Sequence, residues 1–402
     1  MNFFLNKNLR KSEEYFLPLA AFFLLISTAA LNFFIVLSVI FGSIRIILEH
    51  KYFDKIDKKF MLYGLLIFIF LILSSYYSSA SFESIYITLK KYIKFLYIPI
   101  LFYFIRIQNN QKLIIKFFLA GSMIVLLLSY LKYFNIISFT NIYGFFDMNL
   151  FMTLSKATVF QSSIVHGAVF SFIFYLSVYL AKNQKNNWLY LYAFLCFINV
   201  IYMNDSRNSY IVAFFLILLI IYFYLNSKKY MVTTVSLLFI FTLLSPISET
   251  LTKTLYDTKD DINLLIDKNY TSSIGLRSLW AINGMNNIYE KPLFGIGVGG
   301  YENSISNFIS KNNINVQENL AVSNNPHNEF VSISTQLGLF GLMLYTLFLY
   351  SLFKEARNNF LRSGVFVLVF VSSFFNSTFY DNVFGLFIVM IISLVYQKHF
   401  NE

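Results

Sequence analysis

The chain alternates long apolar runs with short polar segments. The runs at 60–73 and 210–225 consist almost entirely of Phe, Leu, Ile, Val and Tyr. A helix that crosses the hydrocarbon core of a bilayer needs roughly 20 apolar residues, so such runs predict membrane-spanning helices. About twelve runs of this kind, several of them short, are present: 15–29, 31–48, 60–76, 92–106, 114–131, 160–181, 187–203, 209–226, 231–246, 331–353, 363–378 and 383–397. The sequence therefore predicts an all-α polytopic membrane protein.

The first two runs adjoin one another and need a break between them. One helix from Tyr15 to Leu48 would measure about 50 Å at ~1.5 Å per residue, whereas the hydrocarbon core is ~30 Å thick. The more polar segment 27–32 lies midway along this stretch. We therefore expect a turn there and two separate spans.

One long polar segment interrupts the pattern between the ninth and tenth predicted spans. It covers 248–326 and is rich in Asn, Ser and Asp. Loops of this length are uncommon unless they have a function or are disordered. We therefore divide the chain into transmembrane spans 1–9 at 1–247, a large loop at 248–326 and spans 10–12 at 327–402.

The loop contains an amphipathic stretch at 273–292, which ends at a proline. Ile274, Leu279, Trp280 and Met285 recur in it at near-helical spacing. This pattern predicts a helix that lies on the outer membrane surface or dips into it.

Composition narrows the class of protein further. Hydrophobic residues make up 57% of the chain and charged residues 13%, against roughly 25% charged in average soluble domains. These proportions exclude a disordered chain and an ordinary cytosolic enzyme. The net charge of +11 is scattered between apolar runs and forms no basic face. This excludes nucleic acid as a partner and indicates basic loops that face anionic membrane lipid.

The same charges predict the orientation in the membrane. With both termini in the cytoplasm, 19 of the 31 Lys and Arg residues fall on cytoplasmic segments and six on short outer segments, in agreement with the positive-inside rule. The long loop then lies outside the cytoplasm. Lys90, Lys91 and Lys94 fall on a short outer segment against the rule, and we expect them to snorkel or to contact substrate phosphates.

A histidine stands where the long loop returns to the membrane. His327 follows Pro326, a residue that fits the first turn of a helix, so we expect the imidazole near a helix N-terminus. That position lowers the pKa of an imidazole and favours the neutral form that acts as a base. A histidine that only caps the helix at headgroup level is the structural alternative. His166, near the outer end of the sixth span, is a second-choice polar contact.

Two glycines follow His327 along the same predicted helix. Gly338 and Gly341 lie eleven and fourteen residues further on. At ~100° per residue these positions are about 20° and −40° from the His327 direction, so all three share a face if the helix is continuous. Glycines on one face allow a neighbouring helix to approach closely.

Two arginines are candidates for anion recognition. Arg207 falls at the outer junction of two spans, and Arg277 lies inside the amphipathic stretch. A guanidinium group is suited to bidentate phosphate contacts at a membrane surface, whereas the alternative role is an interfacial anchor.

Two other patterns do not carry the chemistry that they suggest. The glycine-rich segment 294–301 lacks the Lys-Ser/Thr ending of a nucleotide-binding loop and follows no strand, so we expect a tight turn with close backbone approach. Asp257, Asp260, Asp261 and Asp267 match no calcium-loop spacing, and we expect a solvated acidic segment without metal.

The run that begins at His327 resembles the signature of bacterial O-antigen ligases. That signature is a His, a small polar residue, nine residues, then Gly-x-x-Gly and a hydrophobic residue; here these are His327, Asn328, Gly338, Gly341 and Leu342. The signature is also met in O-antigen polymerases and protein O-oligosaccharyltransferases of the same superfamily.

Other parts of the chain extend the resemblance to essentially its whole length. Arg207 after Ser206 is similar to the family's Ser/Thr-Arg at the outer end of a span. Arg277 with Trp280, followed by 291–301, resembles the family's loop segment. Twelve spans with one large loop between spans nine and ten also match the family's architecture.

The resemblance implies a membrane glycosyltransferase of the inner membrane, acting on the periplasmic side without cofactor or metal. Its donor would be a glycan on undecaprenyl pyrophosphate and its acceptor a sugar hydroxyl of lipid A–core. His327 would be the catalytic base, and Arg207 and Arg277 would bind pyrophosphate; in-line attack would invert the anomeric centre. Supporting positions are Asn328, Gly338, Gly341, Trp280, His166, Lys90 and Lys91.

Two alternatives remain at the level of the sequence. An O-antigen polymerase would use the same chemistry with a growing glycan as acceptor. A transporter or flippase would place charged residues at mid-membrane and show repeated halves, whereas these spans are nearly free of charge and the halves differ.

Overall fold

The computed structural model describes residues 11–49, 58–137, 157–224, 249–314, 316 and 321–397, and every regular element in these ranges is a helix. The described elements are α2 (Phe16–Phe23), α3 (Thr28–Leu48), α4 (Lys59–Ser74), α5 (Phe82–Tyr92), α6 (Lys94–Gln108), α7 (Gln111–Tyr133), α9 (Ser163–Gln184), α10 (Asn187–Ile198), the π-helix η2 (Asn199–Met203), α11 (Arg207–Tyr224), α13 (Glu249–Ile266), α14 (Ser273–Glu290), α15 (Tyr301–Lys311), α17 (Glu329–Ala356), α18 (Phe360–Phe375) and α19 (Asn382–Val395).

The apolar runs of the sequence coincide with these helices, and the run at 231–246 lies outside the described residues. Five described helices are long and apolar enough to cross a membrane: Thr28–Leu48, Gln111–Tyr133, Ser163–Gln184, Arg207–Tyr224 and Glu329–Ala356. Helices α4, α10 with η2, α18 and α19 are apolar but shorter. The protein is thus a helical, multi-pass membrane protein.

The expected break between the first two runs is confirmed. Helix α2 ends at Phe23, and the Ser27 hydroxyl caps α3 by accepting a hydrogen bond of 3.3 Å from the Ala30 N–H. A serine side chain at this position satisfies a backbone donor that would otherwise lack a partner at the helix start.

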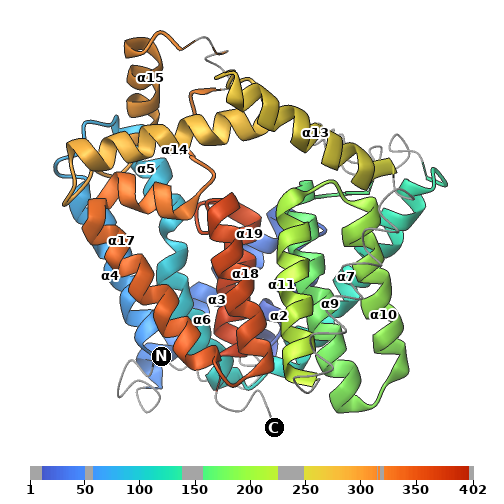
Figure 1. Cartoon of the computed structure of the whole chain (residues 1–402). Helices are drawn as coiled ribbons and strands as arrows, with labels where there is room; N and C mark the ends of the chain where they lie inside the picture. The colour runs from blue at the N-terminus through green and yellow to red at the C-terminus, as the bar shows by residue number, and fades with distance from the viewer. Residues whose placement is uncertain are drawn as a thin grey trace.

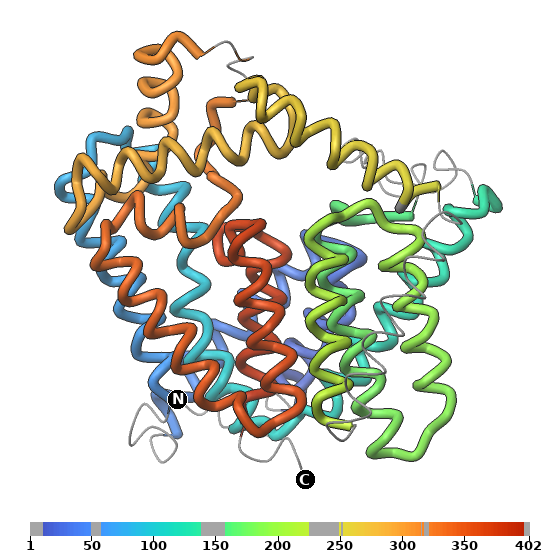
Figure 2. The backbone as a smooth tube through the Cα atoms, viewed as in Figure 1, coloured from blue at the N-terminus to red at the C-terminus, as the bar shows by residue number. Residues whose placement is uncertain are grey.

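Two groups of steep helices stand beside one another, and α13 and α14 lie across one end of both (Figure 1). Helices α4, α6, α17, α18 and α19 form one group, and α9, α10 and α11 belong to the other, with α11 packing on α18. Figure 2 shows α13 and α14 as a crossbar over the two groups, with α15 projecting beyond it. The polar loop of the sequence is therefore built mainly of helices that cover one end of the bundle.

Helix α14 confirms the predicted amphipathic helix but not its predicted apolar face. Leu279 and Trp280 are buried in a small core shared with α15, whereas Met285 is 67% exposed. The buried face is completed by polar and small residues such as Asn283 and Gly284, because α14 packs on α15 and α17 rather than presenting all its apolar residues to a bilayer.

Helix α17 is broken at Gly338, and this overturns the expectation of one continuous helix. Gly338 has φ 65° and ψ −161°, a conformation that only glycine adopts readily. The Leu339 N–H donates to the Pro292 carbonyl at 2.8 Å, and the Ile296 N–H donates to the Thr335 carbonyl at 2.9 Å. The backbone that follows α14 therefore fills the break and satisfies the groups that the broken helix leaves free.

The glycine-rich segment after α14 makes the expected tight turn with close backbone approach. Gly295, Gly297 and Gly299 all have positive φ. A Cβ on Gly297 would lie 2.9 Å from the carbonyl oxygen of Ser74, the last residue of α4, and 2.7 Å from the Cα of Ser78, in the segment after α4. The glycine segment thus packs α13 and α14 against the bundle through close backbone contacts, which a side chain at these positions would prevent.

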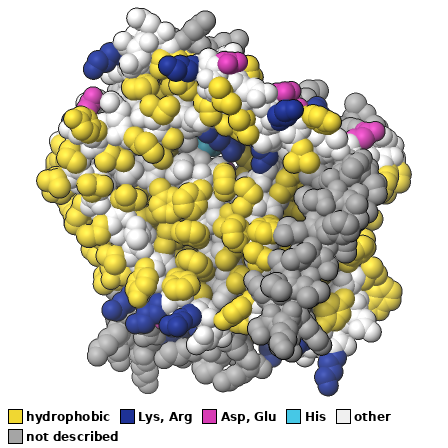
Figure 3. All heavy atoms as spheres, viewed as in Figure 1, with side chains coloured by type: hydrophobic (Ala, Val, Ile, Leu, Met, Phe, Trp, Pro, Cys, Tyr) yellow, Lys and Arg dark blue, Asp and Glu magenta, His cyan; other side chains and the backbone are white. Residues whose placement is uncertain are grey.

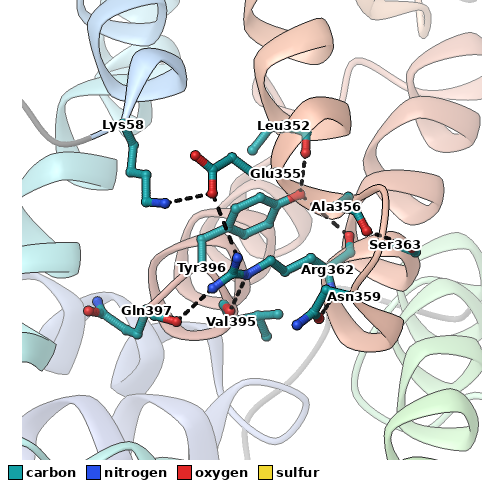
Figure 4. A network of polar contacts seen from close by, with 10 residues as sticks. All are labelled: Lys58, Leu352, Glu355, Ala356, Asn359, Arg362, Ser363, Val395, Tyr396 and Gln397. Carbon is teal, nitrogen blue, oxygen red and sulfur yellow. Dashed lines mark hydrogen bonds and ion pairs between the residues drawn. The ribbon is translucent and has the colours of Figure 1, made fainter. Parts of the chain in front are cut away.

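A polar network ties four helix ends together at the opposite end of the bundle (Figure 4). Glu355, near the end of α17, accepts from Lys58 at 2.6 Å and lies 3.7 Å from Arg362. Arg362 donates to the Gln397 carbonyl at 2.8 Å, and Tyr396 donates to the Leu352 carbonyl at 3.1 Å. This network holds α4, α17, α18 and α19 in register far from the crossbar.

Candidate functional site

His327 lies in the loop that leads into α17, not in the first turn of the helix. Its φ is 51°, and its backbone N–H donates to the Asn325 side-chain oxygen at 2.9 Å. Asn328 is the residue that caps the helix: its side-chain oxygen accepts from the Val331 N–H at 3.1 Å. The expectation that Pro326 opens the helix is therefore wrong, because the helix begins at Glu329, after a loop that turns back on itself.

The imidazole packs against the indole of Trp280. The ring centroids are 5.1 Å apart with an interplanar angle of 31°, and the indole N–H donates to the Ala321 carbonyl at 2.8 Å. The Nδ1 atom of His327 is buried and has no hydrogen-bond partner among the described residues. Trp280 thus holds the loop before α17 against α14 and forms one wall beside the histidine.

Arg277 and Arg207 belong to the same cluster as His327. The Arg277 charge acts on the imidazole, and the Arg207 charge acts in turn on Arg277. Arg207, the first residue of α11, forms an ion pair of 2.8 Å with Asp261 of α13. Helices α11, α13 and α14 and the loop before α17 therefore converge, and Figure 3 shows basic side chains and a histidine gathered beneath α13 and α14.

Burial and the repulsion between neighbouring positive charges lower the pKa values of both His327 and Arg277. Burial, and then the neighbouring Arg277, lowers the pKa of His327 from 6.5 to about 4, although Asn376 opposes the change. Burial and the Arg207 charge also lower the pKa of Arg277, and Asp261 offsets only part of this. Arg277 is largely buried and lies near a second positive charge, on Arg207. A bound anion would stabilise both guanidinium groups, so the cluster is suited to bind an anion.

The two glycines of the sequence signature have structural roles. A Cβ on Gly338 would lie 2.4 Å from the Leu293 carbonyl oxygen, and one on Gly341 would lie 2.2 Å from the Leu337 Cβ. Gly338 admits the crossbar backbone, and Gly341 admits the kink within α17 itself. Neither glycine shares a straight helical face with His327 at which a neighbouring helix would pack.

His166 is placed in a different network. Its Nε2 lies 2.8 Å from the Asn199 side-chain oxygen, and the Asn199 amide donates to the Ser129 hydroxyl at 2.7 Å. The histidine is 1% exposed and packs on Phe170. These contacts join α7, α9 and η2 inside the bundle, and the structure does not bring His166 to His327.

The three outer lysines have different surroundings. Lys90 is exposed at the end of α5, and the Lys91 ammonium lies 5.7 Å from the centroid of the Tyr380 ring. Lys94 is 2% exposed and donates to the carbonyls of Lys91 and Phe379 at 2.9 and 3.0 Å. Lys94 therefore neither snorkels nor reaches a phosphate, because it holds the loop between α18 and α19.

Two members of the cluster, Asp261 and Asn376, are not predicted by the sequence pattern. Asp261 was assigned to a solvated acidic segment, but it is the ion-pair partner of Arg207. Asn376, which raises the pKa of His327, follows α18 and is 3% exposed. One sequence feature points to Asn376: the apolar run before it ends in three polar residues, Asn376, Ser377 and Thr378. Nothing in the spacing of Asp261 indicates that it pairs with Arg207.

The fold and the cluster define a multi-pass membrane protein with an imidazole and two guanidinium groups gathered under helices outside the bundle. Residues 191–346 match the family model described as O-Antigen ligase, which supports the family resemblance seen in the sequence. This segment contains Arg207, Arg277 and His327. A search of curated proteins found no match. The family indicates a membrane glycosyltransferase-type enzyme of lipopolysaccharide biosynthesis.

Proposed function

We propose that the protein is an O-antigen ligase that transfers a polysaccharide from undecaprenyl pyrophosphate to a sugar hydroxyl of lipid A–core. The observation that carries this proposal is the placement of His327 beside Arg277 and Arg207 within the matched segment. The reaction needs a proton acceptor for the attacking hydroxyl and fixed positive charge for the departing pyrophosphate, and this cluster supplies both.

In the proposed reaction, the acceptor oxygen forms a bond to the anomeric carbon while the bond from that carbon to the pyrophosphate oxygen breaks. An imidazole nitrogen of His327 takes the hydroxyl proton. Arg277, with Arg207 behind it, stabilises the charge that grows on undecaprenyl pyrophosphate. Attack from the face opposite the leaving group inverts the anomeric centre, and the step as drawn uses no metal or cofactor.

The orientation forms part of the proposal. The crossbar of α13 and α14 and the His327 cluster would face the periplasm, and the Lys58–Glu355–Arg362 network would face the cytoplasm of the inner membrane. The supporting argument is the positive-inside rule, because in this orientation 19 of the 31 Lys and Arg residues fall on cytoplasmic segments and six on short outer segments. We retain the proposed division into spans 1–9, the outer loop and spans 10–12.

Deletion of the gene separates the ligase from a polymerase of the same superfamily. We expect core lipopolysaccharide without O-antigen, together with long polymer accumulated on undecaprenyl pyrophosphate. Electrophoresis of lipopolysaccharide and mass spectrometry of the lipid-linked glycan measure the two pools. Core that carries a single repeat unit would instead identify a polymerase and refute the ligase.

The pH dependence of transfer should differ between free enzyme and donor complex. With a pKa of about 4, His327 is neutral above that pH in the free enzyme, so kcat/KM should show no acid limb near the ordinary value of 6.5. Bound pyrophosphate offsets the Arg277 charge and raises the pKa of His327, so the acid limb of kcat should lie at higher pH than that of kcat/KM. Measured pH profiles in which the two limbs coincide would contradict this coupling.

A further inference from the structure

A polar pocket lies between α14 and α15, apart from the His327 cluster. It has a volume of about 380 Å³, within the range of roughly 300–1,000 Å³ that is usual for small-ligand sites. Asparagine and serine side chains dominate its lining, and the residues that matter most are Asn283, Asn287, Asn303, Ser304, Asn307 and Phe308. None of the arginine and histidine residues of the proposed active site lines it.

The deepest polar groups of this pocket do not satisfy one another. Asn283 and Asn287 are 1% and 4% exposed, and the Nδ2 atom of each is buried without a hydrogen-bond partner in the described part of the chain. The Ser304 hydroxyl lies 3.1 Å from the Asn283 side-chain oxygen and 2.8 Å from that of Asn287. Because one hydroxyl has one proton, it cannot donate to both oxygens. Donors and acceptors are therefore left over inside the cavity.

The side-chain amides of Asn283 and Asn287 offer neighbouring hydrogen-bond donors and acceptors that lack partners. A ligand that carries both donors and acceptors would satisfy them. A sugar hydroxyl donates one hydrogen bond and accepts others, so adjacent hydroxyls pair with carboxamide groups such as these. Two rim lysines and one glutamate give the lining no strong charge, which disfavours a phosphate as ligand. The ring of Phe308 adds an apolar surface against which a sugar ring can lie.

The pocket is placed where a remote part of the glycan would lie. Arg277, Trp280, Asn283 and Asn287 follow one another along α14, and ten residues at ~1.5 Å per residue separate the ends of this series by about 15 Å. A glycan whose reacting sugar is at His327 can therefore reach the pocket with a sugar further along its chain. Contacts with such remote groups position the reacting centre.

We propose that the α14–α15 pocket is a subsite that binds hydroxyl-rich sugar residues of a glycan substrate. This proposal rests on the proposed transferase function, and it adds a carbohydrate site separate from the reacting groups. Two sources share this chemistry: the glycan of the lipid-linked donor and the core oligosaccharide of the acceptor.

Binding by the full-length protein in nanodiscs tests the subsite without requiring activity. One arm uses the donor glycan released from its pyrophosphate by mild acid, and the other uses delipidated core oligosaccharide, with saturation-transfer difference NMR and calorimetry as readouts. Asn303 and Asn307 line the pocket but are exposed, so Asn303→Trp and Asn307→Trp should block it without disturbing the buried amides. Ser306→Trp, on an exposed position of α15 that does not line the pocket, is the matched control.

One arm should bind to the wild type and to Ser306→Trp, and bind about tenfold or more weakly to Asn303→Trp and Asn307→Trp. The arm that binds identifies the source of the sugar. Absence of binding in both arms, or equal binding by blocked and control variants, would overturn the subsite. His327→Ala should bind like the wild type, because the subsite is separate from the reacting groups. A wild-type chain that binds glycan but does not transfer it would refute the ligase and leave the subsite standing.

Discussion

Replacement of His327 by asparagine is expected to lower kcat for transfer by about 10²–10⁴-fold, the usual contribution of a positioned general base. Asparagine is chosen because the residue has φ 51°, a left-handed conformation that Asn tolerates better than most residues. An amide does not take up a proton near neutral pH, so the variant keeps the backbone and loses the base. His327→Ala should lose transfer to the same extent, with an additional small cost in stability.

Expression level and thermal unfolding in detergent check that these two variants are folded. Neighbouring Asn328 caps α17 in both, so the helix start is unaffected. A stably expressed His327→Asn or His327→Ala protein with wild-type kcat would refute the assignment of the base. Equal loss of activity and of folded protein would point instead to the alternative role at the start of α17.

Replacement of Arg277 by glutamine should lower kcat by about 10²–10³-fold, as loss of a group that stabilises developing negative charge does in other active sites. In the part of the chain that the structure describes, the Arg277 guanidinium has no ion-pair or hydrogen-bond partner of its own, whereas Arg207 is held by Asp261. Arg277→Lys should also fail in large part, because an ammonium group keeps the charge but cannot make two parallel hydrogen bonds to pyrophosphate.

The same variant has a second readout that is independent of turnover number. The Arg277 charge contributes to the low pKa of His327, so its removal raises that pKa and moves the acid limb of kcat/KM to higher pH. Arg277→Lys should leave the limb nearly in place. Full activity of both variants would reduce Arg277 to an interfacial anchor, and an unchanged limb in Arg277→Gln would show that its charge does not act on His327.

Much of the fold could be predicted from the sequence because a bilayer constrains a chain locally. Within lipid each backbone polar group must be satisfied inside its own segment, so an apolar run of sufficient length becomes a helix whatever its neighbours are. The turn near Ser27 follows from the same argument about length. The choice of His327, Arg277 and Arg207 followed from residue chemistry together with the family resemblance, since an imidazole can act as a base and guanidinium groups suit phosphate.

The contacts within the site depend on residues far apart in the chain, and spacing does not encode them. The break at Gly338 exists because the backbone at Pro292 enters α17, and a helical wheel drawn for α17 alone cannot include that backbone. Asp261 pairs with Arg207 only because α13 crosses α11. Lys94 resembles a surface lysine in the sequence, yet it is buried beneath the loop after α18.

The sequence by itself thus determined the helices and predicted the family resemblance and the three candidate groups, because each depends on local composition or on a short motif. Only the tertiary structure decided which groups meet, which glycines break or join elements, and where the amides of α14 and α15 enclose a pocket. The physical reason is that hydrogen bonds, ion pairs and desolvation act over a few ångströms in space, and packing of the crossbar on the bundle sets those distances.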